Sequence, residues 1–328
     1  MRHSATRLFA AALFGLLLTS FSFSRVACGS TVYVYVHNKE QPSHWPGKWF
    51  NSCYAGAAYV DVRDGRLGNI PGGETTRAYC IDYDGPIYIG REYPVTLQPA
   101  TDTNDWRQIA YIITWYDPPA DDTAGVWIQG AIWKIFDNII PSFINSSDGD
   151  WKYRNGINAL YDEASNKDVI RKDDIFKWIF PEPGGNNTYI AANPGEMVTL
   201  KAKITNSIGN ARSGVKVIFS VEGGGSLNKV VGWTDSNGIV EVKVTIPNNV
   251  VDIKVKASTK GVWPQKYLDL GPDKQDLVGI DTTYQLTVST NIWILANISV
   301  VPELPIGTLA AVVSCFLAFL AKTKRSGL

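Results

Sequence analysis

The sequence predicts a mixed α+β domain followed by an all-β sandwich, placed between an N-terminal export signal and a C-terminal membrane helix. Three observations lead to this prediction. The chain has 328 residues, enough for about two domains of ordinary size. Its composition changes near Phe180, from a stretch rich in Trp, Tyr and Asp to a series of alternating strands. Both ends of the chain carry apolar runs of the kind used for export and anchoring.

Residues 1–28 are predicted to be a signal peptide. Arg2 and Arg7 provide a positively charged start, the apolar run 8–18 follows, and small residues begin at Ala27. The run is short for a permanent membrane helix, and its end is small and polar. We therefore expect the peptide to be removed on export.

The opposite end of the chain is predicted to be a membrane anchor. Residues 306–321 carry no charge, and the basic tail 322–328 follows at once. Sixteen residues at helical rise span roughly 24 Å, slightly less than the usual hydrocarbon thickness. Basic residues stay on the cytoplasmic side, so the main body is expected at the cell surface, outside the membrane. Residues 293–305 form the expected linker, and residues 301–308 resemble the PEF-type sorting signals of archaeal surface proteins.

Residues 196–292 are predicted to form the sandwich, after a Pro-, Gly- and Asn-rich linker over 182–195. Apolar residues alternate with polar ones along four segments, which indicates half-buried strands. These segments are 197–204, 215–221, 240–246 and 251–257. Strands without helices over such a length are typical of an antiparallel sandwich. Residues 214–219 and 234–238 also resemble bacterial Ig-like domains of the invasin type, which implies a spacer role.

Residues 29–181 are predicted to mix strands and helices. Strands are expected over 31–36, 57–62 and 78–83. Two helices follow, the first with an N-cap at Thr103 or Asn104 and the second capped by one of the polar residues 121–123. Apolar residues recur at helical spacing along both: Trp106, Ile109, Ala110 and Ile113 in the first, and Val126, Ile132, Trp133 and Phe136 in the second.

Gln129 lies among large apolar residues on the predicted face of the second helix. Burying a primary amide without partners costs roughly 2 kcal/mol or more, so Gln129 needs hydrogen bonds or a chemical change. A Cys thiolate can attack the Gln side-chain carbonyl and expel ammonia. The resulting thioester is less polar and electrophilic, and it hydrolyses slowly where apolar side chains exclude water.

Two short motifs resemble the signature motifs of the thioester domains found on Gram-positive surface adhesins. They are Tyr79-Cys80-Ile81-Asp82 and Ile128-Gln129-Gly130-Ala131-Ile132-Trp133, with Ile128 standing where many members have Thr. Residues 105–113 resemble the helix between those motifs, and the resemblance covers roughly residues 78–137. It implies a β-rich thioester domain with a small helical subdomain over 29–181. In it Cys80 is the thiol donor and Gln129 the acyl donor of an internal cross-link.

The resemblance also implies a function. An amine on a surface ligand, a protein Lys or a polyamine-like group, attacks the Gln129 carbonyl, releases the Cys80 thiol and forms an amide. The protein is then a covalent adhesin, neither an enzyme nor dependent on a cofactor. The alternative is a non-covalent structural protein of the cell envelope with a Cys53–Cys80 disulfide, because two extracellular cysteines ordinarily suggest such a bond.

Other functions are less compatible with the sequence. Lys plus Arg equals Asp plus Glu at 31 each, which argues against nucleic acid as the main partner. A cysteine hydrolase would have only His37 and His44 as a base outside the signal peptide, and no metal-ligand spacing is present. The acidic residues Asp117, Asp121 and Asp122 are interpreted as a solvated, helix-capping loop rather than a calcium site. Candidate N-glycosylation positions are Asn145, Asn186 and Asn297.

Overall fold

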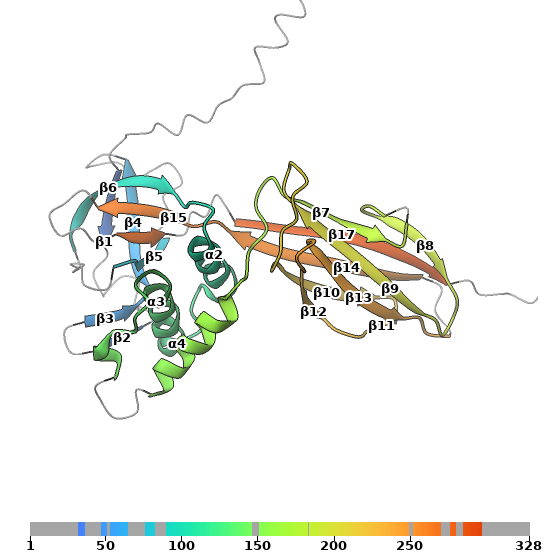
Figure 1. Cartoon of the computed structure of the whole chain (residues 1–328), viewed down its shortest axis with the longest axis horizontal. Helices are drawn as coiled ribbons and strands as arrows, with labels where there is room; N and C mark the ends of the chain where they lie inside the picture. Colours follow the sequence, from blue (N-terminus) through green and yellow to red (C-terminus); the bar gives the residue numbers. More distant parts are fainter. Residues whose placement is uncertain are drawn as a thin grey trace, which may run out of the picture. The chain divides into compact units, whose positions relative to one another are not determined.

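The computed structural model describes residues 32–36, 47–50, 53–64, 76–82, 90–145, 151–182, 184–248, 252–269, 276–279 and 285–296. Contacts divide the chain into two compact units (Figure 1). The first comprises Met1–Lys172 and Lys260–Leu286, and the second Asp173–Thr259 and Thr287–Leu328. The expected signal peptide, the expected anchor over 306–321 and Asn297 lie outside the described residues. Within the described ranges, every helix is too short or too polar to cross a membrane.

The first unit contains a closed barrel of six strands, in the order β1-β4-β5-β16-β15-β6. Neighbouring strands of the barrel run antiparallel. Their bounds are β1 Val32–Val36, β4 Ala58–Asp64, β5 Thr76–Cys80, β6 Glu92–Pro99, β15 Gln265–Asp269 and β16 Leu277–Gly279. Strands β15 and β16 pair with β6 and β5, so they supply the hydrogen-bonding partners that those two strands would otherwise lack.

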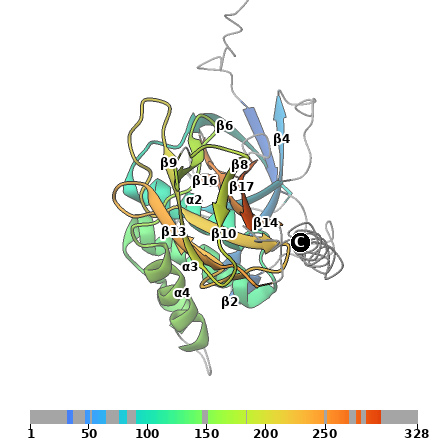
Figure 2. The ribbon, with the colours of Figure 1, turned by 90° about the vertical axis from the view of Figure 1, so that its right-hand side faces the viewer.

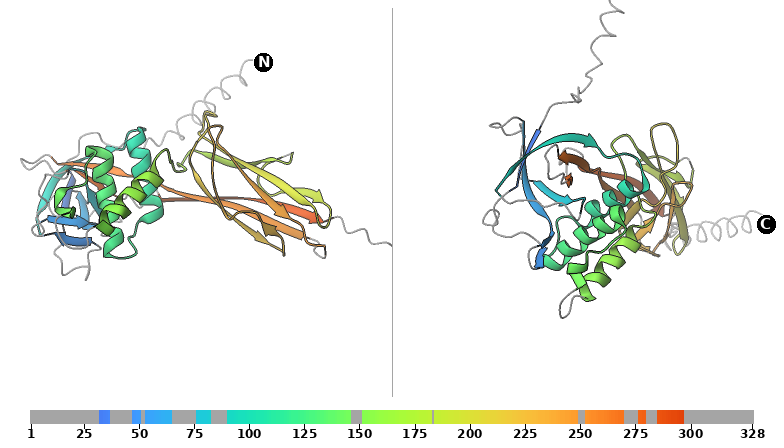
Figure 3. Two further views of the ribbon diagram at one scale, coloured as in Figure 1. Left: turned by 60° about the horizontal axis from the view of Figure 1, so that its bottom comes forward. Right: turned by 60° about the vertical axis from the view of Figure 1, so that its left-hand side comes forward.

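Helices and a short hairpin lie beside the barrel in the same unit (Figure 3). They are β2 Gly47–Phe50, β3 Cys53–Gly56, α2 Asn104–Tyr116, α3 Asp122–Asp137, the 3₁₀ turn η1 Ser142–Asn145 and α4 Trp151–Ala164. The caps confirm two of the expected positions. Thr103 Oγ1 accepts the Trp106 N–H, and Asp121 Oδ1 accepts the Ala124 N–H at 2.8 Å. The third helix, α4, was not expected from the sequence.

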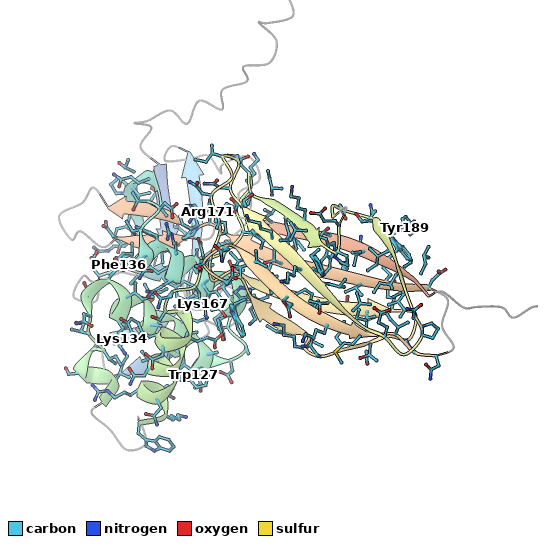
Figure 4. The ribbon with its side chains drawn as sticks, turned by 45° about the vertical axis from the view of Figure 1, so that its right-hand side comes forward. Trp127, Lys134, Phe136, Lys167, Arg171 and Tyr189 are labelled. Carbon is cyan, nitrogen blue, oxygen red and sulfur yellow. The ribbon has the colours of Figure 1, made fainter. Side chains whose placement is uncertain are left out.

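Two glycines allow α3 and α4 to approach closely. A Cβ atom at Gly130 of α3 would lie 2.3 Å from Cδ1 of Ile157 on α4. A Cβ at Gly156 of α4 would lie 2.1 Å from the indole ring of Trp127 on α3, which Figure 4 labels. Each glycine therefore receives a side chain from the facing helix. This packing holds α3, and with it Gln129, in place.

The second unit is a sandwich of two sheets, with strand orders β12-β10-β14-β17-β8 and β11-β13-β9-β7 (Figure 2). The bounds are β7 Ile175–Phe180, β8 Thr188–Ala192, β9 Met197–Thr205, β10 Lys216–Glu222, β11 Ser226–Leu227, β12 Val231–Trp233, β13 Ile239–Thr245, β14 Asp252–Val262 and β17 Gln285–Ala296. Trp178 of one sheet packs against Phe219 of the other, with ring centroids 6.3 Å apart. The alternating burial along β9 and β13 agrees with the expected strands.

The boundaries of the two units differ from those expected. Strand β7 was assigned to the first domain and β8 to a linker over 182–195, yet both are strands of the sandwich. Strands β15 and β16 were assigned to the sandwich, yet they complete the barrel. The physical reason is strand pairing, which satisfies the backbone hydrogen bonds. Strand β7 pairs with β9 of the sandwich, whereas β8 pairs with β17, and β15 and β16 pair with β6 and β5, all distant in sequence. The sandwich segment 173–259 is thus an insertion into the first unit.

Candidate functional site

Strand β5 ends at Cys80, where its pairing with β4 has already stopped. The β4 register runs from Val60↔Thr76 to Ala58↔Ala78. Beyond this point the side chain of Gln129, on α3, takes the place of a neighbouring strand. The Cys80 N–H donates to Gln129 Oε1 at 3.0 Å, and Gln129 Nε2 donates to the Cys80 carbonyl oxygen at 2.7 Å. One primary amide therefore satisfies both backbone groups of the cysteine.

The opposite side of β5 explains why Cys80 faces α3. Cys80 is the register partner of Leu277 on β16, while the next residue, Ile81, donates its N–H to Asp276 O at 2.9 Å. Backbone groups of successive strand residues point to opposite sides, so those of Cys80 point away from β16. Asp82 Oδ2 accepts the Asp276 N–H at 3.0 Å and fixes the strand end. Ile81 and Asp82 of the first motif thus hold the cysteine on its strand.

The paired hydrogen bonds also orient the Gln129 amide relative to Cys80. The Gln129 amide lies along the strand edge, in the plane of the backbone hydrogen bonds. The side chain of a strand residue projects out of that plane. The Cys80 side chain therefore leaves the plane that contains the Gln129 amide.

The site is enclosed by apolar side chains. Gln129 is 1% exposed, and Cys80 is partly buried. Cys80 packs against a hydrophobic cluster drawn from β3, α3, η1 and α4: Ala55, Val126, Trp133, Ile144, Tyr153 and Ile157. The motif neighbours Ile128, Ala131 and Ile132 are buried in a second cluster, with α2 and Tyr79. Gln129 thus lies on α3 between two apolar groups that exclude water.

The thiol of Cys80 is kept neutral by its surroundings. Burial raises the pKa of the Cys80 thiol to about 12, and the nearby carboxylate of Asp82 adds to the increase. Within the described part of the chain Cys80 is a free thiol. The side chain of Cys53, its expected partner in the alternative reading, lies outside the described residues.

A buried charged cluster next to the site was missed by the sequence reasoning. Asp117 was interpreted as part of a solvated loop, but its side chain is only 4% exposed. Its carboxylate accepts hydrogen bonds from Arg77 Nε at 2.9 Å, from Arg77 Nη2 at 2.7 Å and from the Tyr79 hydroxyl at 2.8 Å. Arg77 and Tyr79 alternate along β5 and so share a face, which is visible in the sequence. Their common partner, Asp117, cannot be identified from the sequence.

The other polar candidates have structural roles or remain predictions. Asp121 caps α3, as expected. Within the described ranges, no group of three or more His, Cys, Asp or Glu side chains is arranged to hold a metal ion. Asn145 ends η1, and the exposed Asn186 accepts hydrogen bonds from Thr290 Oγ1 and the Asn291 N–H. Glycosylation of these positions stays a prediction.

No protein-family model and no curated protein matches the chain. Several solved structures are similar to it. The thioester domain of the Enterococcus faecium TIE86 protein is 13% identical, with a TM-score of 0.32, over 82% of this chain and 92% of that chain. The Bacillus anthracis TIE protein is 14% identical, with a TM-score of 0.33, over 82% of this chain and 49% of that chain. The D00-D0 domain of Intimin is 17% identical, with a TM-score of 0.21, over 39% and 51%. At these identities and TM-scores the similarities carry no conclusion about activity, so the proposal below is based on the Cys80–Gln129 geometry.

Proposed function

We propose that Cys80 and Gln129 form an internal thioester that captures amines. The observation that carries the proposal is the pair of hydrogen bonds between the Gln129 amide and the backbone of Cys80. In the forming step the Cys80 sulfur bonds to the Gln129 side-chain carbon and the carbon–nitrogen bond breaks. The thiol proton leaves with the nitrogen as ammonia, so the chain becomes lighter by one ammonia.

The same hydrogen bonds favour this chemistry. As the sulfur attacks, negative charge develops on Gln129 Oε1, which already accepts the Cys80 N–H at 3.0 Å. A donor at this distance, fixed in a buried site, stabilises such an oxyanion. The neutral thiol makes formation slow, because a thiol attacks as its thiolate. A cross-link that forms once in the life of the protein tolerates a slow step.

In the second step an amine attacks the Gln129 carbonyl, the Cys80 sulfur leaves as a thiol, and an amide remains. Non-covalent complexes dissociate under sustained load, whereas an amide does not. We infer that the protein is a surface adhesin whose ligand bears an accessible amine, such as a protein Lys or a polyamine-like group. The predicted signal peptide and the predicted anchor over 306–321 support display at the cell surface.

The test is the intact mass of the purified extracellular chain before and after methylamine. We expect a mass one ammonia below that of the sequence, which rises by one methylamine on treatment. Cys80→Ala and Gln129→Ala should both have the full sequence mass and should not react. Gln108→Ala is the matched control, because Gln108 is also a buried glutamine, 6% exposed, but lies on α2.

Two outcomes would overturn the proposal. A mass two hydrogens below that of the sequence and insensitive to methylamine would instead support the disulfide between Cys53 and Cys80. The full sequence mass would mean that the amide and the thiol remain separate.

A further inference from the structure

Asp117 connects the strand that carries the thiol with the segment that begins the helix carrying the amide. On the strand side it contacts Tyr79, the residue before Cys80, and Arg77. On the helix side Asp117 is the C-cap of α2, and its N–H donates to Ile113 O at 3.2 Å. The short loop 118–120 then leads to Asp121, which caps α3. Both segments are thereby tied to one residue, the strand through the Asp117 carboxylate and the helix side through the Asp117 backbone.

These contacts suit positioning better than stability alone. Moving a charge from water into the protein interior is costly, so a buried ion pair often contributes little net stability. A carboxylate held by two guanidinium nitrogens and one hydroxyl has its position defined from several directions. Because Tyr79 and Cys80 are adjacent on β5, a displacement of Tyr79 moves Cys80 with it.

We propose that Asp117, acting through Tyr79 and Arg77, is a positioning residue that sets the location of the Cys80 thiol relative to the Gln129 amide. The inference rests on the proposed thioester. Reacting groups must be held close together with their orbitals aligned, and a misplacement of about 1 Å can reduce a rate about 100-fold. Loss of the Tyr79 hydroxyl should therefore slow thioester formation by about 10- to 100-fold without unfolding the domain.

The chain provides a matched control for this substitution. Tyr111 on α2 is also completely buried, and its hydroxyl also donates to a carboxylate at 2.8 Å, that of Glu163 on α4. Tyr79→Phe and Tyr111→Phe thus delete the same kind of hydrogen bond in the same unit. Only the first of the two bonds joins β5 to the segment before α3.

The experiment compares wild type, Tyr79→Phe and Tyr111→Phe as the full extracellular chain. Intact mass gives the fraction that lacks one ammonia at purification and its increase during incubation. Thermal melting checks that each variant is folded. We expect wild type and Tyr111→Phe to be fully cross-linked, and Tyr79→Phe to be largely open and to close slowly. Asp117→Asn should behave as Tyr79→Phe does, and Glu163→Gln as Tyr111→Phe does.

The outcomes separate this inference from the proposed function. If wild type shows no loss of ammonia, the thioester and the positioning role both fail. If wild type is cross-linked and folded Tyr79→Phe closes at the wild-type rate, the thioester stands and the positioning role is wrong. Equal slowing by both Phe variants would mean a general effect of stability and would also contradict it. The conclusion depends on Tyr79→Phe, because Asp117→Asn leaves the Arg77 charge without its carboxylate.

Discussion

Opening the cross-link with methylamine should destabilise the first unit by a predictable amount. The proposed Cys80–Gln129 bond would join positions 49 residues apart and so close a large loop that includes β6 and α2. In the chain-entropy treatment of cross-links, a loop of this length stabilises the folded state by about 4 kcal/mol. The hydrogen bonds between Gln129 and Cys80 are those of the primary amide. The N-methyl amide left by methylamine keeps the carbonyl oxygen that accepts the Cys80 N–H, so the loop-entropy term should remain the largest part of the change.

This free energy corresponds to a measurable shift in melting temperature. A change of 1 kcal/mol moves the midpoint of a domain of 150–250 residues by about 2–4 °C, so opening should lower that of the first unit by about 8–16 °C. Differential scanning calorimetry before and after methylamine measures the shift, with intact mass confirming complete opening. The sandwich is an internal control, because its nine strands lie outside the closed loop.

Two comparisons make the result decisive. Gln129→Ala treated with methylamine should show no shift, which excludes an effect of the amine on the solvent. Untreated Cys80→Ala should melt near the temperature of the opened protein. Complete opening with a shift below about 2 °C would refute the reasoning, since it would mean that the loop contributes little entropy to the unfolded state.

Two further predictions concern the thiol and the helix packing. In amine-opened protein, the rate at which iodoacetamide alkylates Cys80, measured by mass spectrometry, should rise about tenfold per pH unit from pH 7 through pH 10. The reason is that burial raises the pKa of the Cys80 thiol to about 12, so the thiolate fraction grows up to that pH. A plateau of the alkylation rate near pH 9 would contradict this. Gly156→Ala should destabilise the first unit by about 1–3 kcal/mol in chemical denaturation, since the added methyl group would overlap the Trp127 ring. Helix propensity alone would leave the stability unchanged or increase it, and that result would contradict the tight α3–α4 contact.

Local features of the fold were predictable from the sequence. Alternation of apolar residues indicated strands such as β9 and β13, and helical spacing with polar caps indicated α2 and α3. These patterns depend on neighbours within a few residues, so the printed sequence contains them. The need of Gln129 for a polar partner could also be predicted, because a glutamine on an apolar helix face is costly to bury unless something satisfies it, and that partner is the backbone of Cys80. Helix α4 was missed, although Tyr153, Ile157, Leu160 and Ala164 are buried at helical spacing.

The tertiary structure alone decided which distant segments pair. Strands β15 and β16 close the barrel, and β7 and β8 join the sandwich, because backbone groups can pair with any strand that presents a free edge. The partners of Cys80 and Tyr79 follow the same rule. The amide of Gln129 occupies the position that β4 vacates, and Asp117 accepts hydrogen bonds from Arg77 and Tyr79, which precede it by 40 and 38 residues. Sequence thus determined which groups need partners, while the packing of strands and helices determined which groups supply them.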